Sequence, residues 1–188
     1  MVWMEVIPID CSGFFCTNIW GSYQNTGILY SRWNGDTWSA PINISSNTGF
    51  AQFPSIAVDS TDTVHVVWDD TSYTGDGLSD VVYKTRSASG TWSTIEVLAR
   101  PAGTVTSRFA RIATDNTNAP NIVFDALIGE NKDSVYWTRK VAGTWTAAEL
   151  ISKDALGNNL TDSQFSDLRS DTPGNLYLTY WSWTKGIF

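Results

Sequence analysis

The stretches SRWNGDTW (residues 31–38), TRSASGTW (85–92) and TRKVAGTW (138–145) align without a gap. Each begins with Ser or Thr followed by Arg, passes through four variable positions, and ends in Thr-Trp. The final tryptophans lie 54 and then 53 residues apart. Self-similarity at a fixed period of this length indicates a repeat architecture, in which each unit is one supersecondary structure.

A second repeated element lies between these turns, at FPSIAVDSTDTVHVVW (53–68), FARIATDNTNAPNIVF (109–124) and FSDLRSDTPGNLYLTY (165–180). The leading phenylalanines are 56 residues apart, and so are three aspartates that each precede a turn. We expect Asx-turn capping from these aspartates, because their carboxylates can accept backbone N–H bonds two residues on. A looser copy, VIPIDCSGFFCTNIW, opens the chain. The aspartates are Asp59, Asp115 and Asp171, with Asp10 in the looser copy.

Each unit holds four short extended runs, which in the second unit are SIAVD, TVHVVW, DVVYKTR and TWSTIEVL. They are rich in β-branched and aromatic residues, are separated by turn residues, and lack helical periodicity. The pattern predicts an all-β β-propeller of four-stranded antiparallel blades, about three and a half in this chain. A solenoid or a β-sandwich is the alternative. The predicted blades are about 5–46, 53–98, 109–152 and a partial blade at 165–188, in a single domain spanning 1–188, with Trp38, Trp92 and Trp145 wedged between neighbouring sheets.

Composition restricts the classes of function. Hydrophobic residues make up 42% of the chain and charged residues 16%, and the net charge is −7. The acidic balance argues against a nucleic-acid partner. No run approaches the roughly 20 apolar residues of a membrane span, and the opening MVWMEVIPID lacks the features of a signal peptide. Cys11 and Cys16 either form a bridge or are two buried thiols. With one His and no second cysteine pair, we expect no metal centre of the Cys/His type.

The repeated turn, Ser/Thr-x-x-x-Gly-x-Thr-Trp, resembles the Asp box of sialidase-like β-propellers, also called BNR repeats. The wider pattern, PSIAVDS…VHVVW followed by VVYKTR…GTW, is similar to the full repeat of that family and covers nearly the whole chain. The copies depart from the family at its aspartate position, which holds Trp33, Ser87 and Lys140. Because the Asp box is a structural hairpin in this family, the resemblance implies the fold and does not identify a catalyst. We expect Trp33 to pack on an adjacent surface or chain.

The predicted topology places two groups of loops at opposite faces. One face carries the Asx turns and the boxes, and the other carries longer loops. Binding residues concentrate on loops held by a rigid scaffold, and the resemblance implies that the face with the longer loops is the active-site face. These loops are 69–80, 99–108, 125–133 and 152–164.

Arginines are the first candidates on that face. In the family a trio of arginines grips the sialic acid carboxylate, which bidentate guanidinium pairing explains. Arg32, Arg86 and Arg139 lie beside the box on the opposite face, so a structural role is expected for them. Arg111, in FARI, resembles the Arg-Ile of the sialidase FRIP motif, and Arg108 lies nearby.

Acidic and aromatic residues complete the candidate set. Asp69, Asp70, Asp76 and Asp80 share one predicted loop, which is either a Ca²⁺ site or a solvated acidic loop. Exposed aromatic rings bind sugar faces, while polar groups satisfy hydroxyls, and Tyr23, Tyr73 and Trp183 fall in such loops. The predicted ligand-binding residues are therefore Arg108, Arg111, Tyr73, Asp69, Asp70 and Trp183, with no catalytic residue, metal ligand or cofactor assigned.

Three hypotheses of function follow. The first is a non-catalytic extracellular module that binds glycans or mediates assembly, because the boxes are degenerate, Glu is scarce and aromatics reach 13%. The second is a glycoside hydrolase of sialidase type, or a fragment of one. The third is a structural subunit of an oligomer or filament. Three and a half blades do not close a ring, so either the chain is part of a longer propeller or self-association completes it.

Overall fold

The computed structural model describes residues 1–6, 26–129 and 132–183. Within these residues the regular elements are fourteen strands in antiparallel sheets, with no helix. No helix long and apolar enough to cross a membrane is therefore found in the described part of the chain. The all-β prediction is confirmed. The β-branched and aromatic runs form the strands because such side chains pack well on a pleated, buried surface.

Four sheets follow one another along the chain. The first has the order β1 (Val2–Val6), β2 (Thr26–Tyr30), β3 (Ile42–Asn43). The second has the order β4 (Ala51–Val58), β5 (Val64–Asp70), β6 (Asp80–Arg86), β7 (Glu96–Val97). The third contains β8 (Thr106–Thr114), β9 (Pro120–Ile128), β10 (Lys132–Val141), β11 (Thr144–Trp145) and β12 (Glu149–Leu150). The fourth pairs β13 (Ser163–Ser170) with β14 (Leu176–Ser182).

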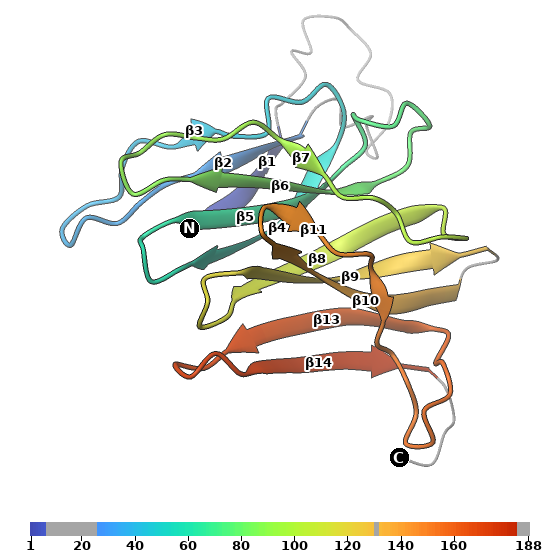
Figure 1. Ribbon diagram of the computed structural model, residues 1–188. Coiled ribbons are helices and arrows are strands. Elements are labelled where there is room, and N and C mark those ends of the chain that lie inside the picture. The colour runs from blue at the N-terminus through green and yellow to red at the C-terminus, as the bar shows by residue number, and fades with distance from the viewer. Residues whose placement is uncertain (7–25, 130–131, 184–188) are drawn as a thin grey trace, which may run out of the picture.

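The sheets lie one beneath the next, from β1–β3 at the top of Figure 1 to β13–β14 at the bottom. The first strands of successive sheets contact each other, β4 against β8 and β8 against β13. No sheet in the described residues closes on itself. The looser opening copy, with Asp10, Trp20, Cys11 and Cys16, lies outside the described residues, as do Tyr23 and Glu130.

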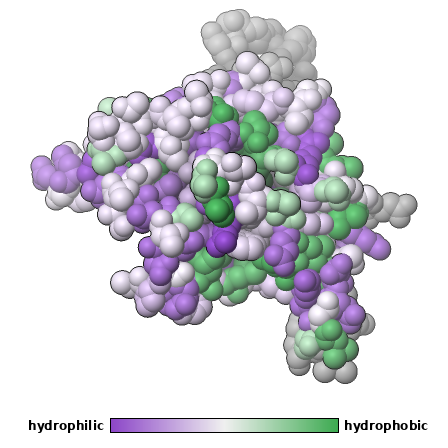
Figure 2. Space-filling model, in the orientation of Figure 1, coloured by the Kyte–Doolittle hydropathy of each residue, from purple (hydrophilic) through white to green (hydrophobic). Residues whose placement is uncertain are grey.

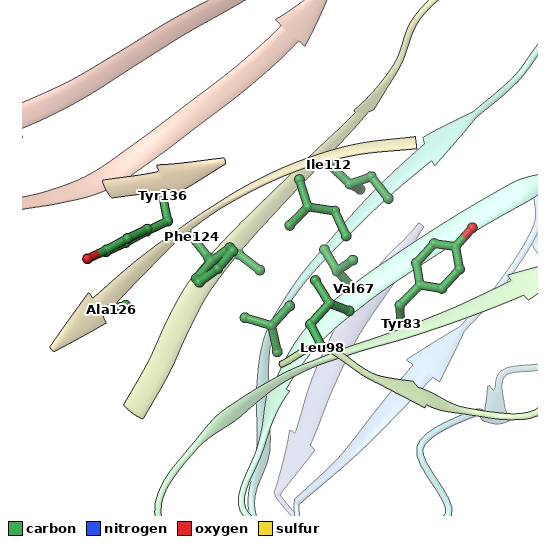
Figure 3. Packing of buried hydrophobic residues seen from close by; sticks show 10 residues of the cluster. Val67, Tyr83, Leu98, Ile112, Phe124, Ala126 and Tyr136 are labelled. Carbon is green, nitrogen blue, oxygen red and sulfur yellow. The ribbon is translucent and has the colours of Figure 1, made fainter. Parts of the chain in front are cut away.

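The main core fills the space between the second and third sheets (Figure 3). Val67 and Tyr83 of the second sheet meet Ile112 and Phe124 of the third, and all four side chains are buried. A second cluster joins the first two sheets, and a third joins the last two. Each sheet is therefore held to the next by apolar burial, the principal favourable contribution to folding.

The expected Asx turns are confirmed. The Oδ1 atom of Asp59 accepts hydrogen bonds from the backbone N–H of Thr61 at 2.8 Å and of Thr63 at 3.0 Å. Asp115 makes the same pair of bonds one repeat later, and Asp171 accepts from the N–H of Asn175 at 2.7 Å. These aspartates stabilise the turns at the ends of β4, β8 and β13 by satisfying loop N–H groups.

The three tryptophans that end the repeated turn make two kinds of contact. Trp92 packs edge-on against Tyr30 of the preceding sheet, with ring centroids 5.1 Å apart, and Trp145 packs in the same way on Tyr83 at 5.0 Å. The predicted wedge is confirmed for these two residues. It is wrong for Trp38, which is 49% exposed and meets Trp33 at 5.7 Å. Trp33 therefore packs against Trp38 on its own hairpin. In the other two copies the equivalent tryptophan contacts a ring of the preceding sheet instead.

Trp145 and Trp38 occupy the same repeat position, so they make a matched pair for mutation. The substitution Trp145→Ala removes the Tyr83 contact and the bond from its indole N–H to Glu96. We expect it to lower the free energy of unfolding by about 3 kcal/mol. Trp38→Ala should cost less than about 1 kcal/mol, because the ring is half exposed. Urea titration measures both, and equal losses would contradict the assignment.

Candidate functional site

The same backbone irregularity occurs near the start of β4, β8 and β13, the first strands of the second, third and fourth sheets. Phe53, Phe109 and Phe165 have φ values of 53°, 56° and 54°. A β-bulge interrupts the pairing of β4, β8 and β13 at the same place. A bulky residue rarely adopts a left-handed conformation, which costs about 1–3 kcal/mol at each position. Three equivalent occurrences indicate a device that the surrounding structure stabilises.

Buried carboxylates supply that stabilisation for Phe109 and Phe165. Asp69, at the end of β5, accepts a hydrogen bond from the backbone N–H of Phe109 in the next sheet at 2.8 Å. Asp125, at the corresponding place in β9, accepts from the N–H of Phe165, also at 2.8 Å. Both aspartates are completely buried. Because a bulge removes an N–H from the strand ladder, these carboxylates satisfy a donor that would otherwise be unpaired.

The bulges direct the phenylalanine rings into a continuous row. The ring centroids are 4.8 Å apart for Phe53 and Phe109, and 5.1 Å apart for Phe109 and Phe165. Trp181 lies 6.5 Å from Phe165, and Trp183 lies 4.6 Å from Trp181. We call these five residues the aromatic row. Phe165 is 60% exposed and Trp183 is 68% exposed, so the row presents ring surface to solvent.

The aromatic row lies at one side of the molecule. In Figure 1 β13 begins and β14 ends on the right-hand side, and Figure 2 shows hydrophobic residues gathered on that side of the same view. This is the face that carries the longer loops. Contiguous exposed apolar surface of this kind marks binding sites in soluble proteins.

Charged groups flank the row. The Arg108 guanidinium lies 5.2 Å from the centroid of the Phe109 ring and forms an ion pair with Asp133, with 2.7 Å between Nη2 and Oδ2. Asp133 is buried, whereas about a third of the Arg108 side chain is exposed. Arg111 donates from Nη1 to the carbonyl of Ala110 at 2.9 Å. A partly exposed guanidinium over an aromatic ring suits both cation–π contact and hydrogen bonding to a ligand.

The buried carboxylates are unusual electrostatically. In each of Asp69, Asp125 and Asp133, the Oδ1 atom has no hydrogen-bond partner among the described residues. Burial raises the pKa of Asp69 to about 7, although the N–H groups of Phe109 and Ala110 and the Arg111 charge oppose the rise. Burial likewise raises the pKa of Asp125 to about 7, and the Asp133 charge adds to the effect. Near neutral pH each of these two groups is therefore partly protonated.

The other predicted residues, Asp70 and Tyr73, lie outside the row. Asp70 accepts hydrogen bonds from the Trp68 indole N–H at 3.0 Å and the Ser72 backbone N–H at 2.9 Å, so its carboxylate is engaged within the fold. Tyr73 is partly exposed in the loop after β5. Burial, with the Asp70 charge, raises the pKa of Tyr73 to about 12, which keeps its hydroxyl protonated as a hydrogen-bond donor.

The acidic loop is neutralised by an arginine. Arg100 forms ion pairs with Asp76 and Asp80, each with an N–O distance of 2.6 Å. These bonds tie the loop between β7 and β8 to the loop between β5 and β6 and to the start of β6. Among the described residues no group of three or more His, Cys, Asp or Glu side chains is arranged to hold a metal ion.

Sequence reasoning identified Trp183 but missed Asp125 and the other four rings of the aromatic row. The 56-residue recurrence of the phenylalanines was visible, but it predicted strand starts rather than solvent-facing rings. Asp125 follows Asp69 by the same 56 residues, and that recurrence could have identified it. The structure brings Arg108, Arg111, Asp69 and Trp183 together with the row.

Comparison with known proteins supports the fold. No family model and no curated protein matches the sequence. Among solved structures, the chain is similar to Hadza microbial sialidase Hz136, with a TM-score of 0.62 and 14% identity over 84% of this chain and 36% of that one. It is also similar to the intramolecular trans-sialidase from Ruminococcus gnavus, solved with oseltamivir carboxylate, with a TM-score of 0.50, 15% identity, and 84% and 33% coverage. The chain thus has a sialidase-like fold and spans about a third of these structures.

The buried carboxylates give a pH prediction. Because the pKa of Asp69 in the folded state lies above its ordinary value of 3.8, the folded chain holds a proton that the unfolded chain releases between about pH 4 and pH 7. The free energy of unfolding should therefore fall as pH rises through that interval. Asp69→Asn keeps an oxygen that accepts the Phe109 N–H but does not titrate, so its stability should depend less on pH. Urea titrations at pH 5 and pH 8 measure this, and an unchanged slope in the variant would refute it.

Proposed function

We propose that the chain is a non-catalytic module that binds carbohydrate along the aromatic row. The observation that carries this proposal is the row itself, five rings in contact from Phe53 to Trp183. A pyranose presents apolar C–H surface on its ring faces, which stacks on aromatic side chains. A row of rings suits successive sugar units of a chain better than one small compact ligand.

The polar groups beside the row support the same ligand class. Sugar hydroxyls need both donors and acceptors close to the stacking surface. Arg108 offers guanidinium N–H donors beside Phe109, and Tyr73 offers a protonated hydroxyl in the loop after β5. Phe109 and Phe165 lie on strand starts fixed by buried hydrogen bonds, so little conformational entropy is lost there on binding. Glycans on cell surfaces and in secretions are the natural ligands, and an extracellular location is part of this proposal.

A sialidase-type hydrolase, or a fragment of one, is the second candidate. It is supported by the sialidase-like fold and by Arg111, whose charge acts on both Asp69 and Asp125. A buried carboxyl group with a pKa near 7 is suited to proton transfer.

We further propose that the sheets are blades of a propeller, about three and a half in this chain, and that self-association contributes the remainder. Among the described strands β14 pairs with β13 alone. Its side chains alternate between half-buried and exposed, as expected of a strand that offers an edge to a partner.

The aromatic row gives a binding prediction. Phe165→Ala and Trp183→Ala should each weaken binding to a glycan array ligand about three- to tenfold, because one aromatic contact contributes ~0.5–1.5 kcal/mol. Tyr177→Ala is the control, since Tyr177 lies on the same strand as Trp181, is similarly exposed and lies outside the row. Isothermal calorimetry measures the affinities. Loss of binding in Tyr177→Ala, or none in the row variants, would refute the proposal.

Hydrolysis distinguishes the two candidates. A non-catalytic module binds glycans and leaves a fluorogenic sialoside intact. If the sialoside is turned over and Arg111→Ala abolishes turnover while the unfolding transition is unchanged, the hydrolase hypothesis replaces the binding module.

Self-association gives a mass prediction. Light scattering on the purified chain should give a mass of at least twice 20.8 kDa. The N–H of Trp183 bonds to Asp162, and N–H direction alternates along a strand, so the N–H of Tyr180 points away from β13. Tyr180→Pro therefore removes a backbone donor at the proposed edge and should reduce that mass to the monomer value. A stable, folded monomer before mutation would contradict the proposal.

A further inference from the structure

A cavity lies at the end of β4 that is far from the aromatic row. Its volume is about 270 Å³, and its lining includes Val58 at the end of β4 and Tyr30 at the end of β2. Phe53 lies five residues earlier on the same strand, so the cavity is separated from the row by roughly 17 Å of extended chain. The cavity is therefore a distinct site, at the turn-bearing face of the molecule.

Two indole rings form its outer wall. Trp33 and Trp38 are cross-strand partners on one hairpin, with ring centroids 5.7 Å apart and planes inclined at 54°. Each is about half exposed. The turn between them is rigid, because the Asn34 side-chain oxygen accepts backbone bonds from Asp36 at 2.9 Å and from Thr37 at 2.8 Å. The rings are thus held in place before any ligand arrives.

Two arginines line the same cavity. Neither Arg32 nor Arg86 forms an ion pair with any carboxylate in the described part of the chain. The Arg86 guanidinium lies 5.8 Å from the centroid of the Tyr30 ring, which orients it without neutralising it. Arg100, by contrast, is paired with two aspartates. Two unpaired guanidinium groups beside apolar rings favour an anionic ligand, and above all a carboxylate, whose geometry they match.

We propose that this cavity is a second carbohydrate site that takes a hexuronate, a pyranose that carries a carboxylate. The ring face stacks on Trp33 and Trp38, and the carboxylate pairs with Arg32 and Arg86. Asp62, which also lines the cavity, accepts hydrogen bonds from ring hydroxyls. The site accounts for Trp33, the residue that occupies the aspartate position of the first box.

Calorimetric titration with a galacturonate trimer tests the proposal, and its methyl ester is the matched neutral ligand. The wild type should bind the acid at millimolar concentrations and the ester about tenfold more weakly, because the charge-assisted bonds are lost. Arg86→Gln and Arg32→Gln should each weaken binding of the acid about tenfold, and Trp33→Ala about three- to tenfold. Arg139→Gln, at the equivalent position of the third repeat, should bind the acid as the wild type does.

The outcomes separate this site from the aromatic row. Equal affinity for the acid and the ester, no binding at millimolar concentrations, or unchanged binding in both arginine variants would each overturn the proposal. Loss of binding in Trp183→Ala would assign the ligand to the aromatic row instead. Because the side chains of Trp33 and Arg32 are exposed, their variants should keep the wild-type unfolding transition, which urea titration verifies.

Discussion

A hydrogen bond between a buried carboxylate and the backbone of the next sheet is the interaction on which the rest of the structure depends. Asp69 reaches from the second sheet to Phe109 in the third, and Asp125 reaches from the third to Phe165 in the fourth. Each bond satisfies the N–H group that a bulge removes from its strand ladder. Without it, a bulky residue at positive φ would add an unpaired donor to its conformational strain.

This bond also determines the surface of the candidate site. A regular strand would direct alternate side chains to its two faces, and the phenylalanines would be buried between sheets. The bulges turn them instead toward the face that carries the longer loops, where three successive rings meet. The cost is two carboxyl groups held away from water, whose pKa values rise to about 7. Stability and the geometry of the candidate site are therefore coupled through the same atoms.

The opposite face is organised by the box hairpins. Trp92 and Trp145 stabilise sheet contacts because each meets an aromatic ring of the preceding sheet. Lys140 adds an ion pair to Glu96 across the same boundary, with Nζ 2.6 Å from Oε1. In the first copy the equivalent Trp38 meets Trp33 and stays half exposed. The same repeat position therefore packs between sheets in the second and third copies and forms a cavity wall in the first copy.

Sequence recurrence predicted the strands and the Asx turns well, but it failed where register matters. By alignment Tyr136 corresponds to Tyr83. In the structure, however, Tyr83 pairs with Val67, whereas the equivalent Val123 pairs with Trp137. The pairing is thus shifted by one residue between the two sheets, and a slip of one residue exchanges the two faces of a strand. Neither residue type nor spacing reveals such a slip.

The sequence by itself determined the all-β class, the order of the strands, the turn aspartates, and Arg108, Arg111, Asp69 and Trp183 as members of a candidate site. These depend on local pattern, since β-branched runs and turn residues act over a few positions. Only the tertiary structure decided that the recurring phenylalanines form an exposed row, that Asp125 joins Asp69, and that Trp38 opens a cavity. Those features depend on bulges and on contacts between sheets about 40 to 60 residues apart in the chain, and burial and direction at such distances are set by packing.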